Sequence, residues 1–275
     1  MIRLALALLP AVALTAPKPL AIQTVRLAQY EDGPPVSSGF EFFPGDTVFV
    51  RGEVGGYKPT EAGNVDLEFE MTAADPAGLA LSEPVRGKVQ AELAPEDKDW
   101  LPKVRGTFLI PPTAPTGNYS LAIRVTDKLA SASATAQTTA KVRGVAVEPG
   151  PVLVARNFRF LRSEEDGPPL KTAAYRPGET LWARLEITGY KFGDKNLVSV
   201  DYGIAVLRSS GEKLFEQPLA AEEKEGSYYP KRFVPGALSL NLAKDIRPGE
   251  YVIVLTVHDR VGAQTAESRH VFQVE

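Results

Sequence analysis

The chain has 275 residues, of which 44% are hydrophobic and 24% are charged, and its formal net charge is −3. This composition excludes a disordered or fibrous protein, and 31 basic against 34 acidic residues without a basic block argue against nucleic-acid binding. The absence of cysteine excludes disulfides, a thiolate nucleophile, cysteine-ligated zinc and a lipid-modified cysteine.

The first 21 residues are predicted to be a signal peptide and leader. An apolar run at 4–14 follows a short basic start, and small residues follow at Ala13 and Ala16. The run has about 11 residues, whereas a membrane-spanning helix needs roughly 20. We therefore expect cleavage near 13–21 and an exported protein, periplasmic or extracellular, whose mature chain has no transmembrane anchor.

The rest of the sequence contains an internal duplication. Four motifs recur in the same order 132 to 134 residues further along: Glu-Asp-Gly-Pro-Pro at 31–35 and 165–169, Pro-Gly-Asp/Glu-Thr at 44–47 and 177–180, Gly-Tyr-Lys at 56–58 and 189–191, and Gly-Asn/Glu-Tyr at 117–119 and 249–251. Such a repeat indicates two copies of one structural unit. We predict two domains, at 22–146 and 152–275, joined by a Pro/Gly linker at 147–151.

Within each repeat, apolar residues alternate with a period of two, which is typical of half-buried strands. The clearest runs lie at 48–54, 65–71 and 121–125 in the first repeat, and at 181–187, 198–204 and 252–257 in the second. Turn residues separate the runs, and no stretch has helical periodicity. The sequence therefore predicts an all-β protein of two tandem immunoglobulin-like antiparallel β-sandwich domains, each with about seven strands.

Two pairs of residues favour the immunoglobulin-like topology. Tyr119 and Tyr251 open the sixth strand after a glycine turn, where a tyrosine corner bonds its hydroxyl to nearby backbone. Asp127 and Asp259 end that strand and are predicted to cap the turn into the seventh. Calcium ligation by these aspartates is the alternative, although no alternating acidic ligands accompany them.

A family resemblance supports the same fold. The runs Tyr-Arg-Pro-Gly-Glu-Thr-Leu at 175–181 and Asp-Ile-Arg-Pro-Gly-Glu-Tyr at 245–251 resemble macroglobulin-type (MG) and related bacterial immunoglobulin-like domains. The first repeat is similar, with Phe43 where the second has Arg176. The resemblance implies a β-sandwich and no activity, because the chain lacks the cysteine of a thioester and fold does not determine function.

No residue constellation predicts catalysis or metal binding. The two histidines, His258 and His270, lack zinc-site spacing, and no nucleophile elbow, phosphate loop or dinucleotide fingerprint is present. Carboxylates at 31–32 and 164–166 could act on a sugar, but their Asp-Gly-Pro-Pro segments explain them as turns. We predict no enzyme, no cofactor and no metal; a carbohydrate-active enzyme is an alternative.

Loops after the second, fourth and sixth strands share one end of each sandwich, which we call its pole. Tyrosine and tryptophan there offer large amphipathic contact area. The candidate binding pole comprises Tyr57, Lys58, Trp100 and Lys103 in the first repeat and Tyr190, Lys191, Tyr228, Tyr229 and Lys231 in the second. The predicted function is a non-catalytic module that binds a protein or glycan. The alternatives are that the aromatics cover the sandwich end, and that the protein is a structural or assembly subunit of the cell envelope.

The outward face of the second strand is a further candidate. Phe49, Arg51 and Glu53 match Trp182, Arg184 and Glu186 at alternate positions. The stripe could stack a sugar or a neighbouring domain, or it could be a self-satisfied ladder of surface side chains.

Overall fold

The computed structural model describes residues 18–97, 99–146, 149–165 and 167–275. The predicted signal peptide lies outside these ranges except for its last four residues. Of these, Leu20 packs against the first core and Ala21 begins the first strand, so both belong to the folded body. In the described part of the chain, no helix has the length and apolarity needed to cross a membrane.

The N-terminal half forms two antiparallel sheets, in the orders β1-β2-β5 and β4-β3-β6-β7. Its strands are β1 (Ala21–Ala28), β2 (Thr47–Gly55), β3 (Asn64–Ala74), β4 (Val85–Glu92), β5 (Lys103–Leu109), β6 (Gly117–Asp127) and β7 (Ala132–Val142). We call this pair of sheets the N-terminal sandwich.

The C-terminal half repeats the arrangement with the sheets β8-β10-β13 and β12-β11-β14-β15-β9. Its strands are β8 (Val154–Leu161), β9 (Ala174–Tyr175), β10 (Thr180–Thr188), β11 (Val198–Arg208), β12 (Lys213–Glu225), β13 (Val234–Asn241), β14 (Gly249–Asp259) and β15 (Gln264–Val274), with a single 3-10 turn at Asp194–Asn196. We call this pair the C-terminal sandwich. The all-β sandwich prediction is thus confirmed.

The topology is the same in both halves. The short β9 pairs in parallel with β15, and a parallel bridge between Phe42 and Val142 is its N-terminal counterpart. The fourth strand joins the sheet of the third, whereas a constant-type immunoglobulin domain keeps it in the sheet of the first. The macroglobulin-type assignment itself stays a prediction.

Alternating burial explains why these segments are strands. In β2 the alternate residues at 48, 50, 52 and 54 are buried while those at 49, 51 and 53 are partly exposed, and β10 has the same pattern. Inward side chains of the two sheets form one core in each half. The N-terminal core also includes Tyr229, which belongs to the loop between β12 and β13.

Both predicted tyrosine corners are present. The Tyr119 hydroxyl donates to the carbonyl of Pro115 at 2.9 Å, and the Tyr251 hydroxyl donates to that of Arg247 at 2.6 Å. Burial raises the pKa of Tyr119, so its hydroxyl stays protonated and donates.

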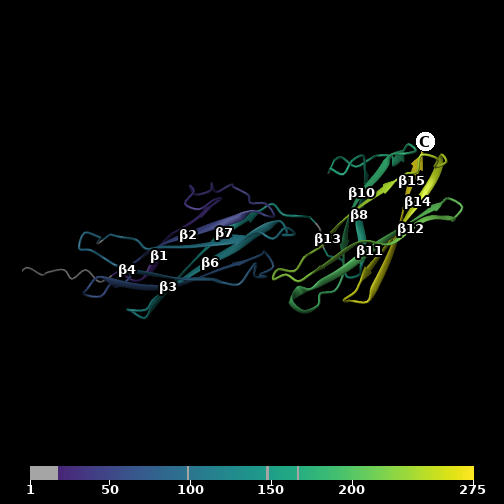
Figure 1. The fold of residues 1–275 in the computed structure, drawn as a ribbon. Coiled ribbons are helices and arrows are strands. Elements are labelled where there is room, and N and C mark those ends of the chain that lie inside the picture. The colour runs from purple at the N-terminus through teal and green to yellow at the C-terminus, as the bar shows by residue number, and fades with distance from the viewer. Residues whose placement is uncertain (1–17, 98, 147–148, 166) are drawn as a thin grey trace, which may run out of the picture.

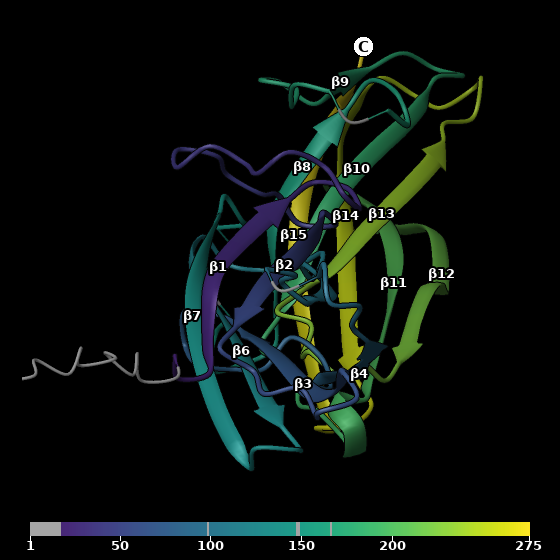
Figure 2. The same cartoon turned by 90° about the vertical axis from the view of Figure 1, so that its left-hand side faces the viewer.

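The two sandwiches follow one another along the molecule (Figure 1). A view turned by 90° places the N-terminal strands in front of the C-terminal ones (Figure 2). The loop between β12 and β13 contacts the N-terminal sandwich, where its Tyr229 and Arg232 bond to Asp75.

Candidate functional site

In each pole one aspartate ties the turn after the sixth strand to the loop after the second strand. Asp127 Oδ1 accepts the backbone N–H groups of Leu129 and Ala130, which caps the turn as predicted. Its Oδ2 accepts the N–H of Lys58, 2.9 Å away in the β2–β3 loop. Asp259 makes the same three bonds in the C-terminal sandwich, to Val261, Gly262 and Lys191. These backbone bonds account for both aspartates without a metal.

The tyrosine of each Gly-Tyr-Lys motif ties the loop after the second strand to the loop after the fourth strand. Tyr57 donates its hydroxyl to the carbonyl of Trp100 at 2.7 Å, and Tyr190 donates to that of Lys231 at 2.7 Å. Burial, and next the charge of Asp97, raises the pKa of Tyr57; burial also raises that of Tyr190. The predicted proximity of the loops after the second and fourth strands is therefore present in both halves.

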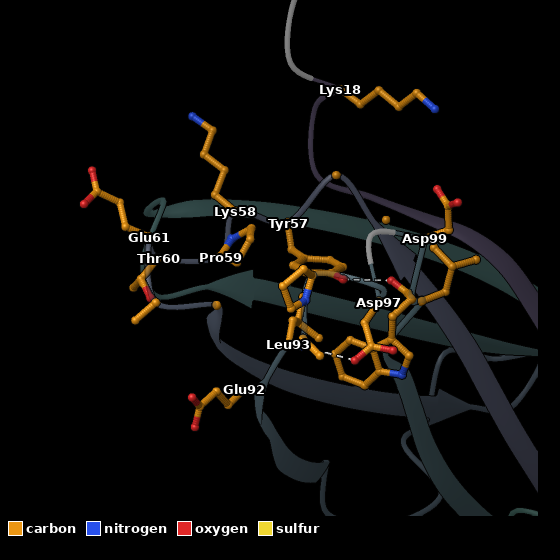
Figure 3. A pocket seen from close by; sticks show the side chains of 18 of the residues that line it. Lys18, Tyr57, Lys58, Pro59, Thr60, Glu61, Glu92, Leu93, Asp97 and Asp99 are labelled. Carbon is orange, nitrogen blue, oxygen red and sulfur yellow. Dashed lines mark hydrogen bonds between the residues drawn. The ribbon is translucent and has the colours of Figure 1, made fainter.

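At the N-terminal pole the loops surround a cleft of about 1240 Å³. The rings of Tyr57 and Trp100 meet edge to face with centroids 6.2 Å apart, and both side chains are half-buried. Figure 3 shows Tyr57 within the cleft, with Asp97 beside it and Lys58 extending away. Charged residues at the rim are Lys18, Lys58, Glu61, Glu92, Asp97 and Asp99. The cleft thus combines an aromatic surface with a polar rim.

The C-terminal pole is occupied in part by the N-terminal sandwich. Tyr229 is only 6% exposed, and its hydroxyl donates to Oδ2 of Asp75 at 2.9 Å. Arg232 Nη2 lies 3.3 Å from the same oxygen, and the Arg232 N–H bonds to Thr113 Oγ1 at 3.4 Å. The Asp75 side chain is fully buried. Tyr229 is therefore a contact between the sandwiches rather than a free binding residue.

The other predicted pole residues are spread between surface and internal contacts. Lys58, Lys103, Lys191 and Tyr228 are exposed, whereas Tyr190 is buried and serves the loop framework. Lys231 forms ion pairs with Glu223 and Glu225. At the C-terminal pole, then, Lys191 and Tyr228 remain accessible.

The outward stripe of β2 and the repeated acidic motif form one structure. Asp32 Oδ1 lies 2.9 Å from Arg105 Nη2, and Arg51 lies between Asp32 and Glu53 at 3.9 and 3.8 Å. In the C-terminal sandwich, Arg184 donates to the carbonyl of Glu164 at 2.7 Å. Asp166, a member of the predicted acidic motif, lies outside the described residues. In the N-terminal sandwich the acidic motif therefore contacts the outer face of the sheet through Asp32.

Sequence reasoning did not identify Asp75, Thr113 or Arg232. The segment at 75–78 has the composition of a turn, and Asp75 Oδ1 indeed accepts the N–H groups of Ala77 and Leu79 at 2.8 Å. Because this local role already explains an aspartate at position 75, the sequence gives no reason to expect a distant partner. Oδ2 of Asp75 nevertheless accepts a hydrogen bond from Tyr229, 154 residues away. The one available signal was the run of Tyr, Pro, Lys and Arg at 228–232, which indicates a contact surface without naming the partner.

No protein-family model matches the sequence, and no curated protein matches it at a significant level. Among solved structures, the C-terminal domain of the AgI/II polypeptide BspA of Streptococcus agalactiae matches 93% of this chain and 100% of its own, with 10% identity and a TM-score of 0.31. The C-terminal domain of the antigen I/II-family protein AspA of Streptococcus pyogenes matches 94% and 100%, with 10% identity and a TM-score of 0.31. The alkylpurine DNA glycosylase AlkC of Pseudomonas fluorescens matches 45% of this chain and 30% of its own, with 12% identity and a TM-score of 0.29. Likenesses this distant identify no family.

Proposed function

We propose that this protein is an exported, non-catalytic interaction module that binds a protein or a glycan at its N-terminal pole. The observation that carries the proposal is the cleft lined by Tyr57 and Trp100. Concave sites with aromatic walls and a few polar groups are the usual form of a binding site. Trp and Tyr also dominate the energy of many interfaces.

The contrast between the two poles supports the choice of the N-terminal one. The duplicated loop framework is the same at both poles, but Tyr229 and Arg232 of the C-terminal pole engage Asp75. Tyr229 is buried between the sandwiches and cannot contact a ligand. The N-terminal pole keeps its cleft, so a two-sandwich chain of this design presents one main binding end.

Charges at the cleft narrow the ligand class. In the part of the chain that the structure describes, its lining includes four carboxylates and two lysines: Glu61, Glu92, Asp97, Asp99, Lys18 and Lys58. Among these described residues the carboxylates outnumber the lysines by two, which favours a neutral or cationic surface over an anionic one. A neutral glycan or a basic protein segment meets this requirement.

The rival role, assembly by strand addition, is less well supported. The longest edge strand, β12, carries Pro218 and a run of acidic residues, and its pairing with β11 is bulged at two places. Proline, charge and bulges are the features by which edge strands avoid pairing with other chains. These features argue against β12 as an acceptor strand.

The test is binding to a glycan array and to immobilised extracts of the producing cell, with the intact chain beside Trp100→Ala. Truncating a central aromatic costs about 2 kcal/mol or more, so capture should fall by roughly thirtyfold. Tyr228→Ala is the matched control, because Tyr228 is 50% exposed at the other pole. Equal capture by folded Trp100→Ala and by the intact chain would remove the N-terminal pole from the proposal.

A further inference from the structure

Three arginines stand in one row across the outer face of the β1-β2-β5 sheet. Arg26 is the register partner of Arg51, and Arg51 is the partner of Arg105. Their chain neighbours Leu27, Val50 and Val104 are buried, so the arginines lie on the opposite, outward side. Like charges directly opposite one another destabilise a sheet unless counter-charges offset them.

Among the described residues, acidic side chains lie closer to Arg105 than to Arg51 or Arg26. Asp32 is 2.9 Å from Arg105 Nη2 but 3.9 Å from Arg51 Nη1, and Glu53 is 3.8 Å from Arg51 Nη2. Distances near 3.9 Å are ion contacts and too long for hydrogen bonds. Arg26 is exposed and makes no ion pair with any residue that the structure describes.

Arg51 therefore has hydrogen-bond donors that lack an acceptor among the described residues. Within the described ranges its guanidinium makes no hydrogen bond, and its Nε is buried without a partner. Native proteins rarely leave a buried donor unsatisfied. The corresponding Arg184 of the C-terminal sandwich differs, because it donates to the carbonyl of Glu164.

A pocket of about 340 Å³ lies over this row. Its floor includes all three arginines and the adjacent cross-strand row of Ala28, Phe49 and Thr107. The turn around Tyr30–Gly33, in which Asp32 has a φ of 55°, supplies another wall, and Val85 adds apolar surface. Guanidinium donors therefore lie beside aromatic and aliphatic walls.

We propose that this pocket binds a monoanionic organic carboxylate with an apolar body. A planar carboxylate accepts paired hydrogen bonds from a guanidinium, and a small rotation of Arg51 would turn Nε and one Nη toward it. Arg26 supplies a second positive charge from the adjacent strand. Glu31 and Asp32 also line the pocket, so a dianion such as phosphate is disfavoured by repulsion. The site is separate from the N-terminal pole and does not depend on its proposed function.

The experiment titrates the full chain with phenylacetate, with the arginine Nε–H signals followed by NMR. Phenylacetamide, its neutral analogue, and inorganic phosphate are titrated in parallel. We expect a saturable shift of the Arg51 signal with phenylacetate alone. Arg51→Lys, which keeps the charge but loses the planar donor pair, should weaken binding about tenfold or more. The equivalent Arg184→Lys in the C-terminal sandwich should leave it unchanged.

Arg26→Gln provides a second variant at an exposed position, where folding is not at risk, and it should also weaken binding. The proposal is overturned if phenylacetate gives no saturable shift at millimolar concentration. It is equally overturned if phenylacetamide or phosphate binds as well, or if Arg51→Lys and Arg26→Gln, both folded, bind like the intact chain.

Discussion

The Tyr229 hydroxyl lies 2.9 Å from Oδ2 of Asp75, and this hydrogen bond joins the two sandwiches across 154 residues of sequence. Burial raises the pKa of Tyr229, and the neighbouring carboxylate of Asp75 acts in the same direction. The tyrosine is therefore protonated and donates. Asp75 Oδ1 also accepts the N–H groups of Ala77 and Leu79, so local bonds hold the carboxylate whose other oxygen meets Tyr229 and Arg232.

Tyr229→Phe removes this bond and keeps the ring in the N-terminal core. A hydrogen bond to a buried charged group contributes about 1–3 kcal/mol, so the free energy of unfolding should fall by that amount. Urea denaturation measures it. Residual dipolar couplings should also change from one alignment tensor shared by both sandwiches to two. Tyr228→Phe is the control, and equal stability of both variants would show that the bond does not couple the sandwiches.

The glycine of each Gly-Tyr-Lys motif is predicted to be irreplaceable for a steric reason. Gly189 has a φ of +78°, and a Cβ there would lie 1.8 Å from the carbonyl oxygen of Val152. Gly56 is similar, with a φ of +72° and a Cβ 2.1 Å from the Pro19 oxygen. Gly189→Ala thus adds a backbone clash to the conformational cost of about 1 kcal/mol for an alanine at positive φ.

Gly211→Ala is the matched comparison, since Gly211 has a φ of +88° but no atom within 4 Å of the added Cβ. In thermal or urea unfolding, Gly189→Ala should lose clearly more stability than Gly211→Ala. Similar losses would mean that the close approach of Val152 is not what selects glycine in the motif.

His270 is predicted to make stability depend on pH. Its ring stacks on Phe158 with centroids 3.5 Å apart, and Nε2 lies 2.9 Å from the Ser268 hydroxyl. Burial lowers the pKa of His270 below its ordinary value of about 6.5. As the pH falls below that value, the unfolded chain binds a proton that the folded chain does not, so the folded state loses stability.

Urea unfolding of the intact chain and of His270→Phe between about pH 7.5 and 5 tests this. The variant keeps an aromatic ring against Phe158 and differs from the intact chain only at position 270. The intact chain should lose stability relative to the variant as the pH falls. If the free energy of unfolding changed with pH in the same way for both proteins, the claim that burial lowers the pKa of His270 would be contradicted.

Alternation of apolar residues was sufficient to predict the strands, because burial on one face of a sheet has a period of two. Tyr119 and Asp127 were also predictable, since each acts on backbone within a few residues. The sheet to which the fourth strand belongs was not predictable. Alternation shows which side chains of a strand face the core, but it does not show which strand lies next to it. The pairing of β4 with β3 rather than with β5 appears only in the structure.

The same limit applies to the poles. The sequence placed Tyr57 and Trp100 together because consecutive loops of a sandwich alternate between its ends. It gave Tyr228 and Tyr229 equal weight, yet one is 50% exposed and the other 6%. In a loop no periodicity tells which of two adjacent side chains turns inward, and the contact that decides it comes from Asp75 in the other sandwich.

The central claim, that the N-terminal pole is the binding end, is tested most directly by tryptophan fluorescence. The chain has two tryptophans, Trp100 and Trp182, so Trp182→Phe leaves Trp100 as the sole reporter and Trp100→Phe leaves Trp182 on the outer face of β10. Titration with a ligand captured by the intact chain should give a saturable change in Trp100 emission and none in that of Trp182. Undiminished binding with unchanged Trp100 emission would contradict the claim.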